Sequence, residues 1–359
     1  MKRMVKFPSI EQFRNIIKNV QHSAQYVGYD DVTNTPIMNR GAKMPVITAI
    51  ATEKLHGSHM GICYSNPDGF WVQSRENIIT PEQDNAACAF NAMQNKDAWM
   101  EIINALANEH NVDLNTQIIT VYAEWCGGSI QKKSAVTGLE KMAVLFNNFK
   151  VSPLEPSETE SAVWFETKIG ETWVEKPQNR IFNICNFPTY EIEIDFNQPL
   201  MSQNKMVELV EKIIEPNSPV GRQFGIEKNT GEGIVCSFKF KDSLYQFKVK
   251  GSEHSNTKVK TLKPVDDVKL QKIQDIAQQV TPAWRLEQMF ALANDTINGG
   301  TAKIENMGTF LKFVNQDILK EESDVIATAE LEPKEIFPVV ARIARQWYSE
   351  ELDRMVFNT

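Results

Sequence analysis

The sequence predicts an α+β fold with two parts. Up to about residue 264, short β-branched and apolar runs, which favour strands, alternate with segments whose apolar residues recur at helical spacing. Beyond that point only the helical spacing remains, as in Leu286, Met289, Phe290 and Ala293. We therefore expect a mixed body over residues 1–264, followed by a small all-helical domain over residues 265–359.

The elements of the body follow from local patterns. Ser9 is expected to cap a first helix, because apolar residues after it fall on one helical face. Thr80-Pro81 is expected to open a second helical region, which runs with a break near Asn95 to about Asn108. Amphipathic spacing predicts a third helix over 206–214, and composition predicts a loop over 152–161. Apolar runs predict strands at 45–52, 60–64, 70–74, 117–125, 142–151, 163–165, 181–185, 190–194, 232–240 and 244–249.

The composition is that of an ordinary globular protein. Of the 359 residues, 42% are hydrophobic and 23% are charged, and no apolar run approaches the roughly 20 residues of a membrane span. The basic start of the chain lacks the apolar segment of a signal peptide. The five cysteines are scattered, which disfavours a zinc site or a disulfide framework. We therefore expect a cytoplasmic protein without a membrane partner.

The first candidate site residue is Lys54, at the end of an expected strand and three residues before Gly57. A lysine amine can act as a nucleophile, and a glycine allows the backbone to approach a ligand closely. Free lysine has a pKa of about 10.4 and is mostly protonated at neutral pH. Neighbouring cations or a bound metal would lower that pKa. Taken alone, such a segment is more often an exposed turn.

Three further patterns place charged residues on expected strands. Glu124 lies in an apolar strand, where an unpartnered carboxylate is costly, so a ligand hydroxyl or a metal-bound water is indicated. Glu232 stands at the start of another strand. Lys248 and Lys250 alternate with Val249 and so share one strand face, where two ammonium groups suit a polyphosphate. The alternatives are an edge-strand glutamate facing solvent and a charged outer face of a sheet.

The net charge of −8 disfavours a protein whose main role is to coat nucleic acid. A local basic surface exists nevertheless, because seven lysines stand against two acidic residues between Lys239 and Lys263. The alternative for this run is a solvated face.

In their order, these motifs resemble the covalent nucleotidyltransferase superfamily of RNA ligases, DNA ligases and mRNA capping enzymes. The similarity is closest to the phage nick-sealing RNA ligases and the trypanosome RNA-editing ligases. Their first motif reads K-x-H-G, as in Lys54-Leu55-His56-Gly57, where DNA ligases and capping enzymes have K-x-D-G. The segment Tyr122-Ala123-Glu124-Trp125 also resembles that branch. The resemblance covers roughly residues 45–260 and implies a nucleotidyltransferase fold with ATP-grasp-like antiparallel sheets.

The resemblance also implies a role for each candidate residue. Lys54 would attack the α-phosphorus of ATP and carry AMP covalently. Lys248 and Lys250 would contact the phosphates. Glu232 would organise a divalent metal, Mg²⁺ or Mn²⁺, with Glu124 near the ribose as a second carboxylate. The other nucleotide contacts would come from the backbone of Glu53 and Leu55, from His59, from Arg75 and from an adenine-stacking Phe146.

The implied activity is ATP-dependent joining of RNA 3′-hydroxyl and 5′-phosphate ends, through lysyl-AMP and an adenylylated RNA 5′ end, in RNA repair or nick sealing. The expected partners are ATP and RNA ends, on a nicked duplex or as single strands. We expect a monomer whose helical domain helps to engage RNA. One alternative is an ATP-dependent DNA ligase or a GTP-dependent capping guanylyltransferase, which His56 disfavours. The other is a non-catalytic RNA-binding protein on a decayed ligase fold, which the intact charged set disfavours.

Overall fold

The computed structural model describes residues 2–84, 86–132, 134–155, 161–226, 230–251, 264–296 and 303–357. Contacts between Cα atoms divide the chain into two compact units. The first comprises Met1–Ile16, Thr48–Ile192 and Lys205–Leu262. The second comprises Ile17–Ile47, Glu193–Asn204 and Lys263–Thr359. The segments Ile17–Ile47 and Glu193–Asn204 thus group with the C-terminal helices, although both precede the expected domain boundary at residue 264.

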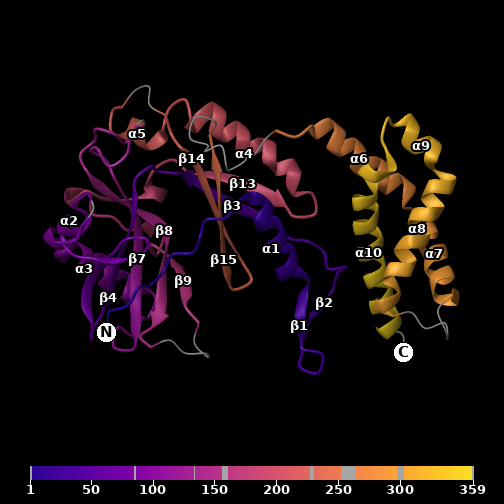
Figure 1. Ribbon diagram of the computed structural model, residues 1–359, viewed down its shortest axis with the longest axis horizontal. Helices are drawn as coiled ribbons and strands as arrows, with labels where there is room; N and C mark the ends of the chain where they lie inside the picture. The colour runs from indigo at the N-terminus through magenta and orange to yellow at the C-terminus, as the bar shows by residue number, and fades with distance from the viewer. Residues whose placement is uncertain are drawn as a thin grey trace. The chain divides into compact units, whose positions relative to one another are not determined.

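The first unit contains a seven-stranded sheet in the order β12-β8-β7-β4-β5-β6, with β9 alongside β8 (Figure 1). Its strands pair antiparallel, except for β12 and β8, which are parallel. The strands are β4 (Ser58–Ser65), β5 (Gly69–Gln73), β6 (Ile78–Ile79), β7 (Gln117–Cys126), β8 (Met142–Pro153), β9 (Val163–Glu166) and β12 (Ile181–Asn183). A separate short hairpin joins β10 (Lys168–Ile169) to β11 (Thr172–Trp173).

A four-stranded sheet in the order β13-β3-β14-β15 positions the site residues: Lys54 directly follows β3, Glu232 directly precedes β14, and the lysine pair lies on β15. Its strands are β3 (Val46–Glu53), β13 (Tyr190–Asp195), β14 (Gly233–Phe240) and β15 (Ser243–Lys250). In the register, Val235 of β14 lies between Thr52 of β3 and Lys248 of β15. The backbone N–H of Lys54 donates to the carbonyl of Gly233, so the nucleophile candidate directly follows this pairing.

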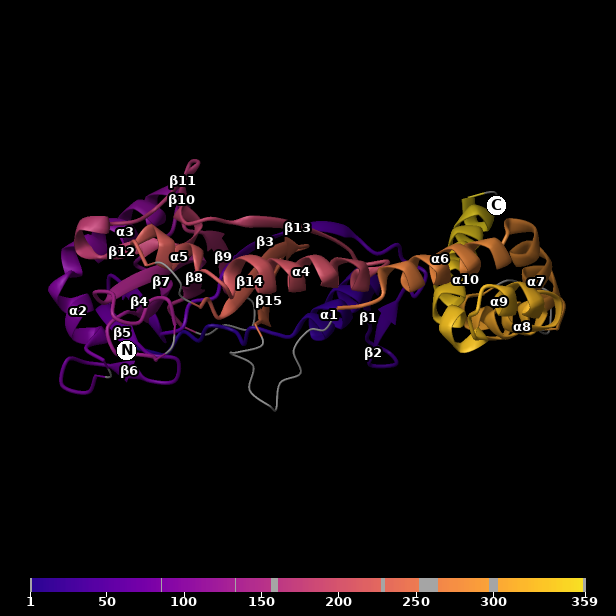
Figure 2. The same cartoon turned by 90° about the horizontal axis from the view of Figure 1, so that it is seen from above.

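Helices cover the seven-stranded sheet on one side. Helices α2 (Cys88–Gln94) and α3 (Lys96–Glu109) lie beside it in both views (Figures 1 and 2). Buried Trp99 and Leu106 of α3 pack with Ile119 and Val121 of β7 in one apolar core. The unit also contains the start of α1 (Phe13–Gln25), most of α4 (Gln203–Leu209) with the π-helical turn Val210–Ile214, and α5 (Pro219–Gln223).

The second unit contains a helical bundle and a short hairpin. The helices are α6 (Asp267–Val280), α7 (Ala283–Thr296), α8 (Met307–Glu321), α9 (Ser323–Thr328) and α10 (Pro333–Phe357), and the hairpin is β1 (Tyr26–Asp30) with β2 (Thr35–Met38). The buried guanidinium of Arg285 pairs with Asp317 at 2.8 Å and Glu322 at 2.6 Å, so its charge is compensated within the bundle. No helix among the described residues has the length and apolar character needed to cross a membrane.

The expected mixture of antiparallel sheets with a helical C-terminal region is confirmed, and the strands lie within a few residues of the predicted positions. Two helix starts were predicted wrongly. Helix α1 begins at Phe13, and the Ser9 hydroxyl instead accepts a hydrogen bond from Arg75 at 3.5 Å. Helix α2 begins at Cys88, because Thr80 closes a tight turn with Gln83 and Ala87 adopts a left-handed conformation.

Candidate active site

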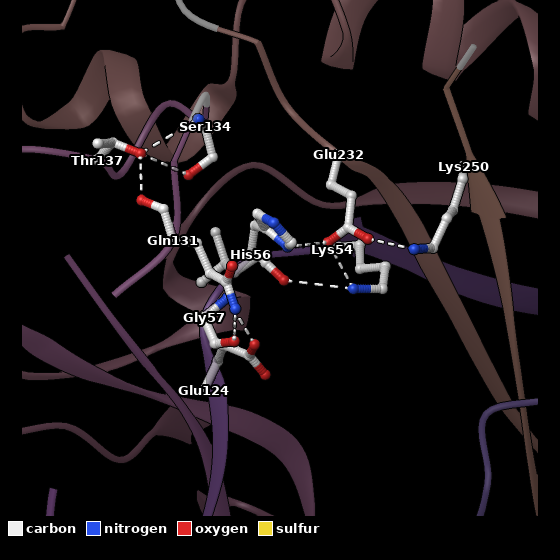
Figure 3. A network of polar contacts seen from close by, with 10 residues as sticks. Lys54, His56, Gly57, Glu124, Gln131, Ser134, Thr137, Glu232 and Lys250 are labelled. Carbon is white, nitrogen blue, oxygen red and sulfur yellow. Dashed lines mark hydrogen bonds and ion pairs between the residues drawn. The ribbon is translucent and has the colours of Figure 1, made fainter. Parts of the chain in front are cut away.

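Lys54 lies at the end of β3 with its ammonium group directed at Glu232 (Figure 3). Its Nζ donates to Glu232 Oε2 at 2.6 Å and to the Leu55 carbonyl at 3.4 Å. Lys250 approaches the same carboxylate from β15, with its Nζ 2.6 Å from Oε1. His56 Nδ1 lies 3.3 Å from Oε2. One carboxylate therefore organises the nucleophile candidate, a second lysine and the histidine of the first motif.

The Glu232 side chain is only 2% exposed, so its charge depends on these partners. Burial acts to raise the pKa of Glu232, but the hydrogen bond from His56 and the interactions with Lys54 and Lys250 outweigh it and hold the pKa well below its usual range. Glu232 is therefore ionised at neutral pH and holds the two ammonium groups close to each other.

The glycine of the first motif is required for close packing. Gly57 donates its backbone N–H to Glu124 Oε1 at 2.8 Å, which fixes the position of this carboxylate. A Cβ at Gly57 would lie 2.4 Å from the Trp125 carbonyl oxygen, too close for any side chain. Burial raises the pKa of Glu124 to about 7, against the opposing charge of Lys54 and the hydrogen bond from Gly57. The edge-strand alternative for Glu124 is wrong, since β7 lies between β4 and β8.

Lys248 adds a further cation to this cluster. Lys248 and Lys250 share one face of β15, while Val249 between them is buried, as the alternation predicted. Burial lowers the pKa of Lys248, and the charges of Lys250, Lys54 and Arg75 lower it further. The charge of Glu232 acts in the opposite direction, but among the described residues no carboxylate lies within ion-pair distance of Lys248, which suits this lysine to an anionic ligand.

A pocket with an empty volume of about 520 Å³ adjoins Lys54 between the two sheets. Apolar residues line much of it, together with Glu53, Lys54 and Glu124. The lining residues are Phe7, Ile10, Thr52, Glu53, Lys54, Leu55, Glu124, Val144, Phe146, Asn147, Ile184, Val235 and Gln246. An apolar slot beside a cluster of ammonium groups suits a ligand with a flat ring at one end and phosphates at the other.

His59 lies opposite Glu124 in the register of β4 and β7, with its ring among Phe7, Tyr122 and Phe146 at centroid distances of 5.6 to 5.9 Å. Burial, assisted by the charge of Arg75, lowers the pKa of His59 to about 4, so the ring is neutral at physiological pH. His59 and Arg75 line a second, more open pocket with an empty volume of about 1230 Å³. His59 and Arg75 therefore lie beside the Lys54 pocket and do not line it.

The structure brings most predicted site residues together and separates a few. Glu53, Lys54, Leu55, Glu124 and Phe146 line one pocket, with Glu232 and Lys250 bonded to Lys54 or its partner. Of the predicted lysine run, Lys258, Lys260 and Lys263 lie outside the described residues. Sequence reasoning missed Phe7 and Ile10 as pocket residues, since they lie outside any recognised motif. It also gave His56 no role beyond the motif pattern.

Gly233 is needed where β14 passes between Lys54 and Lys250. Its φ is +150°, and a Cβ there would lie 2.1 Å from the Val249 carbonyl oxygen. We expect Gly233→Ala to lower the free energy of unfolding by about 3 kcal/mol. Thermal or urea unfolding measures this, with Gly28→Ala as control, because a Cβ at Gly28 meets no atom within 4 Å. Equal stability losses in the two variants would contradict the steric explanation.

Glu53 is expected to make stability depend on pH. Its Oε2 accepts the Val220 N–H at 2.8 Å, and burial raises its pKa to about 7 despite opposing effects of Ser218, Val220 and Arg222. The folded chain therefore holds a proton that the unfolded chain releases above about pH 4.3, so this contribution falls as pH rises towards 7. Relative to Glu53→Gln, the wild type should lose about 2 kcal/mol between pH 5 and 8 in urea unfolding. A stability difference independent of pH would refute this.

Together, the two sheets form a pocket that has a lysine amine at its edge and a cluster of ammonium groups beside it. The RNA ligase family model matches residues 47–250, which contain the whole charged cluster and every residue that lines the pocket except Phe7 and Ile10. The chain therefore belongs to the RNA ligase family.

Solved structures give more distant similarities. An RNA ligase of Naegleria gruberi in an apo mutant form matches at 16% identity with a TM-score of 0.41. A mutant of that ligase with ATP and Mn matches at 16% identity and a TM-score of 0.41, and another with AMP and Mn at 15% and 0.40. Each match covers 70% of this chain and 57% of the Naegleria chain, so the protein spans little more than half of that ligase. Curated protein sequences give no significant match.

Proposed function

We propose that the protein is an ATP-dependent RNA ligase that joins a 3′-hydroxyl to a 5′-phosphate through AMP bound to Lys54. The observation that carries the proposal is the convergence of Lys54 and Lys250 on Glu232, each at 2.6 Å, beside a pocket that is lined largely by apolar side chains. Membership of the RNA ligase family supports it independently.

The proposed reaction consists of three displacements at phosphorus. The neutral Lys54 amine attacks the α-phosphorus of ATP, so a phosphorus–nitrogen bond forms and the bond to pyrophosphate breaks. A 5′-phosphate oxygen of RNA then attacks the AMP phosphorus and releases the amine. Finally, an RNA 3′-hydroxyl attacks the activated 5′-phosphate, loses its proton and expels AMP.

The site residues suit these steps through charge and position. The ammonium proton of Lys54 must pass to solvent before the first attack, because the low pKa of Glu232 makes this carboxylate a weak base, and the hydrogen bond to Glu232 Oε2 positions the Lys54 group. Lys248 and Lys250 would offset charge that develops on the phosphates. Phe146 and the apolar pocket walls would hold the adenine, and the backbone beside Glu53 and Leu55 would contact its edge. Arg75 and His59 would lie on the RNA-end side.

The donor set also fits a divalent metal. Magnesium binds typically through one or two carboxylates together with substrate phosphates, rather than in an all-protein cage. Glu124 and Glu232 provide two carboxylates close enough for the charge of one to raise the pKa of the other. No cluster of three or more His, Cys, Asp or Glu residues suited to a metal occurs among the described residues. Glu124 and Glu232 would thus hold Mg²⁺ or Mn²⁺ together with ATP, and the metal would neutralise phosphate charge.

The proposed placement of the protein among the nick-sealing and RNA-editing ligases rests on the first motif, Lys54-Leu55-His56-Gly57. The histidine at position 56 contacts Glu232. An aspartate at this position would instead place a second negative charge beside the Glu232 carboxylate. The histidine of the K-x-H-G pattern therefore has a structural role here. This supports placement with the nick-sealing and RNA-editing ligases rather than with DNA ligases or capping enzymes. A role in RNA repair and an RNA-engaging function of the helical domain remain proposals.

Intact-mass measurement tests the proposal. The purified protein is first treated with pyrophosphate to remove bound AMP, then incubated with Mg²⁺ and either ATP or GTP. We expect the mass of one AMP to be added with ATP, located at Lys54 by peptide mapping, and none with GTP. An adduct with GTP alone would indicate a guanylyltransferase, and no adduct with either nucleotide would overturn the proposal. Sealing of RNA nicks but not of DNA nicks would then exclude a DNA ligase.

A further inference from the structure

A basic patch surrounds Trp164 at the rim of the pocket. It consists of Arg3, Lys6, Lys150 and Lys239, which come from the N-terminal segment, β8 and β14. Lys150 lies opposite Trp164 in the register of β8 and β9, with its Nζ 5.6 Å from the ring centroid. Lys239 Nζ donates to the Trp164 carbonyl at 3.1 Å, and Lys150 Nζ to the Lys6 carbonyl at 3.4 Å. The ammonium groups of Lys150 and Lys239 are therefore both held at Trp164, one beside its ring and one at its carbonyl.

The charges of the patch are poorly compensated. Among the described residues the only carboxylate paired with these cations is Glu76, 3.8 Å from Lys6, in a contact where both side chains are well exposed. Arg3 donates to the carbonyls of Pro153 and Leu154 rather than to an acid. Burial and the charge of Arg3 lower the pKa of Lys150. Clustering like charges in this way costs stability, so an anionic partner is indicated.

The patch is continuous with the pocket through aromatic contacts. The Phe7 ring lies 5.2 Å from Phe146 and 5.6 Å from Trp164, centroid to centroid. Phe7 and Phe146 both line the Lys54 pocket. A polyanion whose end reaches Lys54 can therefore extend past Phe7 to the ammonium groups of Lys150 and Lys239. The partly exposed indole of Trp164 adds a surface on which a base can stack.

We propose that the basic patch is a track for the RNA strand, in which Lys6, Lys150 and Lys239 contact backbone phosphates and Trp164 holds Lys150 and Lys239 in position. The inference rests on the proposed function and deepens it, because it assigns RNA contacts outside the nucleotide pocket. An acidic protein would also compensate the charges of the patch, but binding such a protein does not explain why the patch adjoins the pocket. The RNA-binding test below distinguishes the two partners.

The test compares RNA binding by three double variants of the full chain. Lys150→Gln/Lys239→Gln removes two charges from the patch, and Lys150→Arg/Lys239→Arg keeps them. Lys212→Gln/Lys320→Gln removes two charges elsewhere, at exposed lysines paired with Glu208 and Glu321. The probe is a labelled nicked RNA duplex with a 5′-phosphate and a 3′-deoxy end, which binds without being sealed. Anisotropy is measured between about 50 and 200 mM salt, the range over which phosphate contacts are lost.

We expect the patch glutamine variant to bind RNA about tenfold more weakly at low salt, and its salt dependence to fall by about two counterions. The arginine variant and the surface control should behave like the wild type. Unchanged binding in the patch variant, or equal weakening in the surface control, would overturn the track. Adduct formation with ATP involves no RNA and serves as the fold control, and its loss in the patch variant would overturn the inference too.

The same experiment separates the two proposals. If the wild type forms no adduct but binds RNA through the patch, the ligase proposal fails and the track stands. If adduct formation is normal and the patch glutamine variant binds RNA as tightly as the wild type, the track proposal fails and the ligase proposal stands.

Discussion

Replacing Lys54 with alanine is expected to abolish covalent capture of AMP. The amine is the only group in the proposed first step that forms a bond to phosphorus, so no neighbouring side chain replaces it. Loss of a covalent nucleophile typically reduces turnover by at least 1000-fold. Intact-mass measurement after incubation with ATP and Mg²⁺ should show no adduct, and RNA nick sealing that starts from ATP should fall below detection.

Two controls make this result specific. Lys54→Arg keeps a positive charge at the position but has no amine nucleophile at neutral pH, so it should also fail. Lys43→Ala removes an exposed lysine and should form the adduct normally. Both Lys54 variants should remain folded, and Lys54→Ala should lose more stability than Lys54→Arg, because alanine removes one of the cations that pair with the buried Glu232 carboxylate. An adduct in either Lys54 variant would refute the assignment of the nucleophile.

Glu232→Gln should have the second-largest effect, a decrease of about 100-fold in the rate of adduct formation. The carboxylate holds Lys54 and Lys250 at 2.6 Å each and contacts His56, so its neutralisation leaves mutually repelling cations without their shared anchor. Displacement of a reacting group by about 1 Å is enough for a loss of this size. Single-turnover mass spectrometry with saturating ATP measures the rate. Glu208→Gln, which removes an exposed partner of Lys212, is the matched control.

The same variant changes the response to acid. The pKa of Glu232 is held below that of an unfolded glutamate, so its stabilising contribution is present above about pH 4.3 and is lost as pH falls towards the folded value. Glu232→Gln should therefore lose less stability than the wild type between pH 6 and 3. A variant that forms the adduct within twofold of the wild-type rate, or that shows the full acid sensitivity, would contradict the role given to Glu232.

Local sequence determined the strands and the chemistry of the candidate residues. The run before Glu53 is β-branched, and the alternation of Lys248, Val249 and Lys250 fixed which side chains share a face. These predictions succeeded because they depend on neighbours a few residues apart. The helix starts at Ser9 and Thr80 failed because capping residues also suit turns, and the turn at Thr80 prevailed.

Only the tertiary structure decided which charges meet. Lys54 and Glu232 are 178 residues apart in the chain, and their contact depends on the pairing of β14 with both β3 and β15. The patch around Trp164 depends likewise on three distant segments. Strand register is set by the long-range packing of buried faces, whereas the type of each residue and the alternation along a strand can be read from the local sequence. The sequence therefore determined which groups were available, and the register of the sheets determined that a buried carboxylate would hold two lysines beside a pocket.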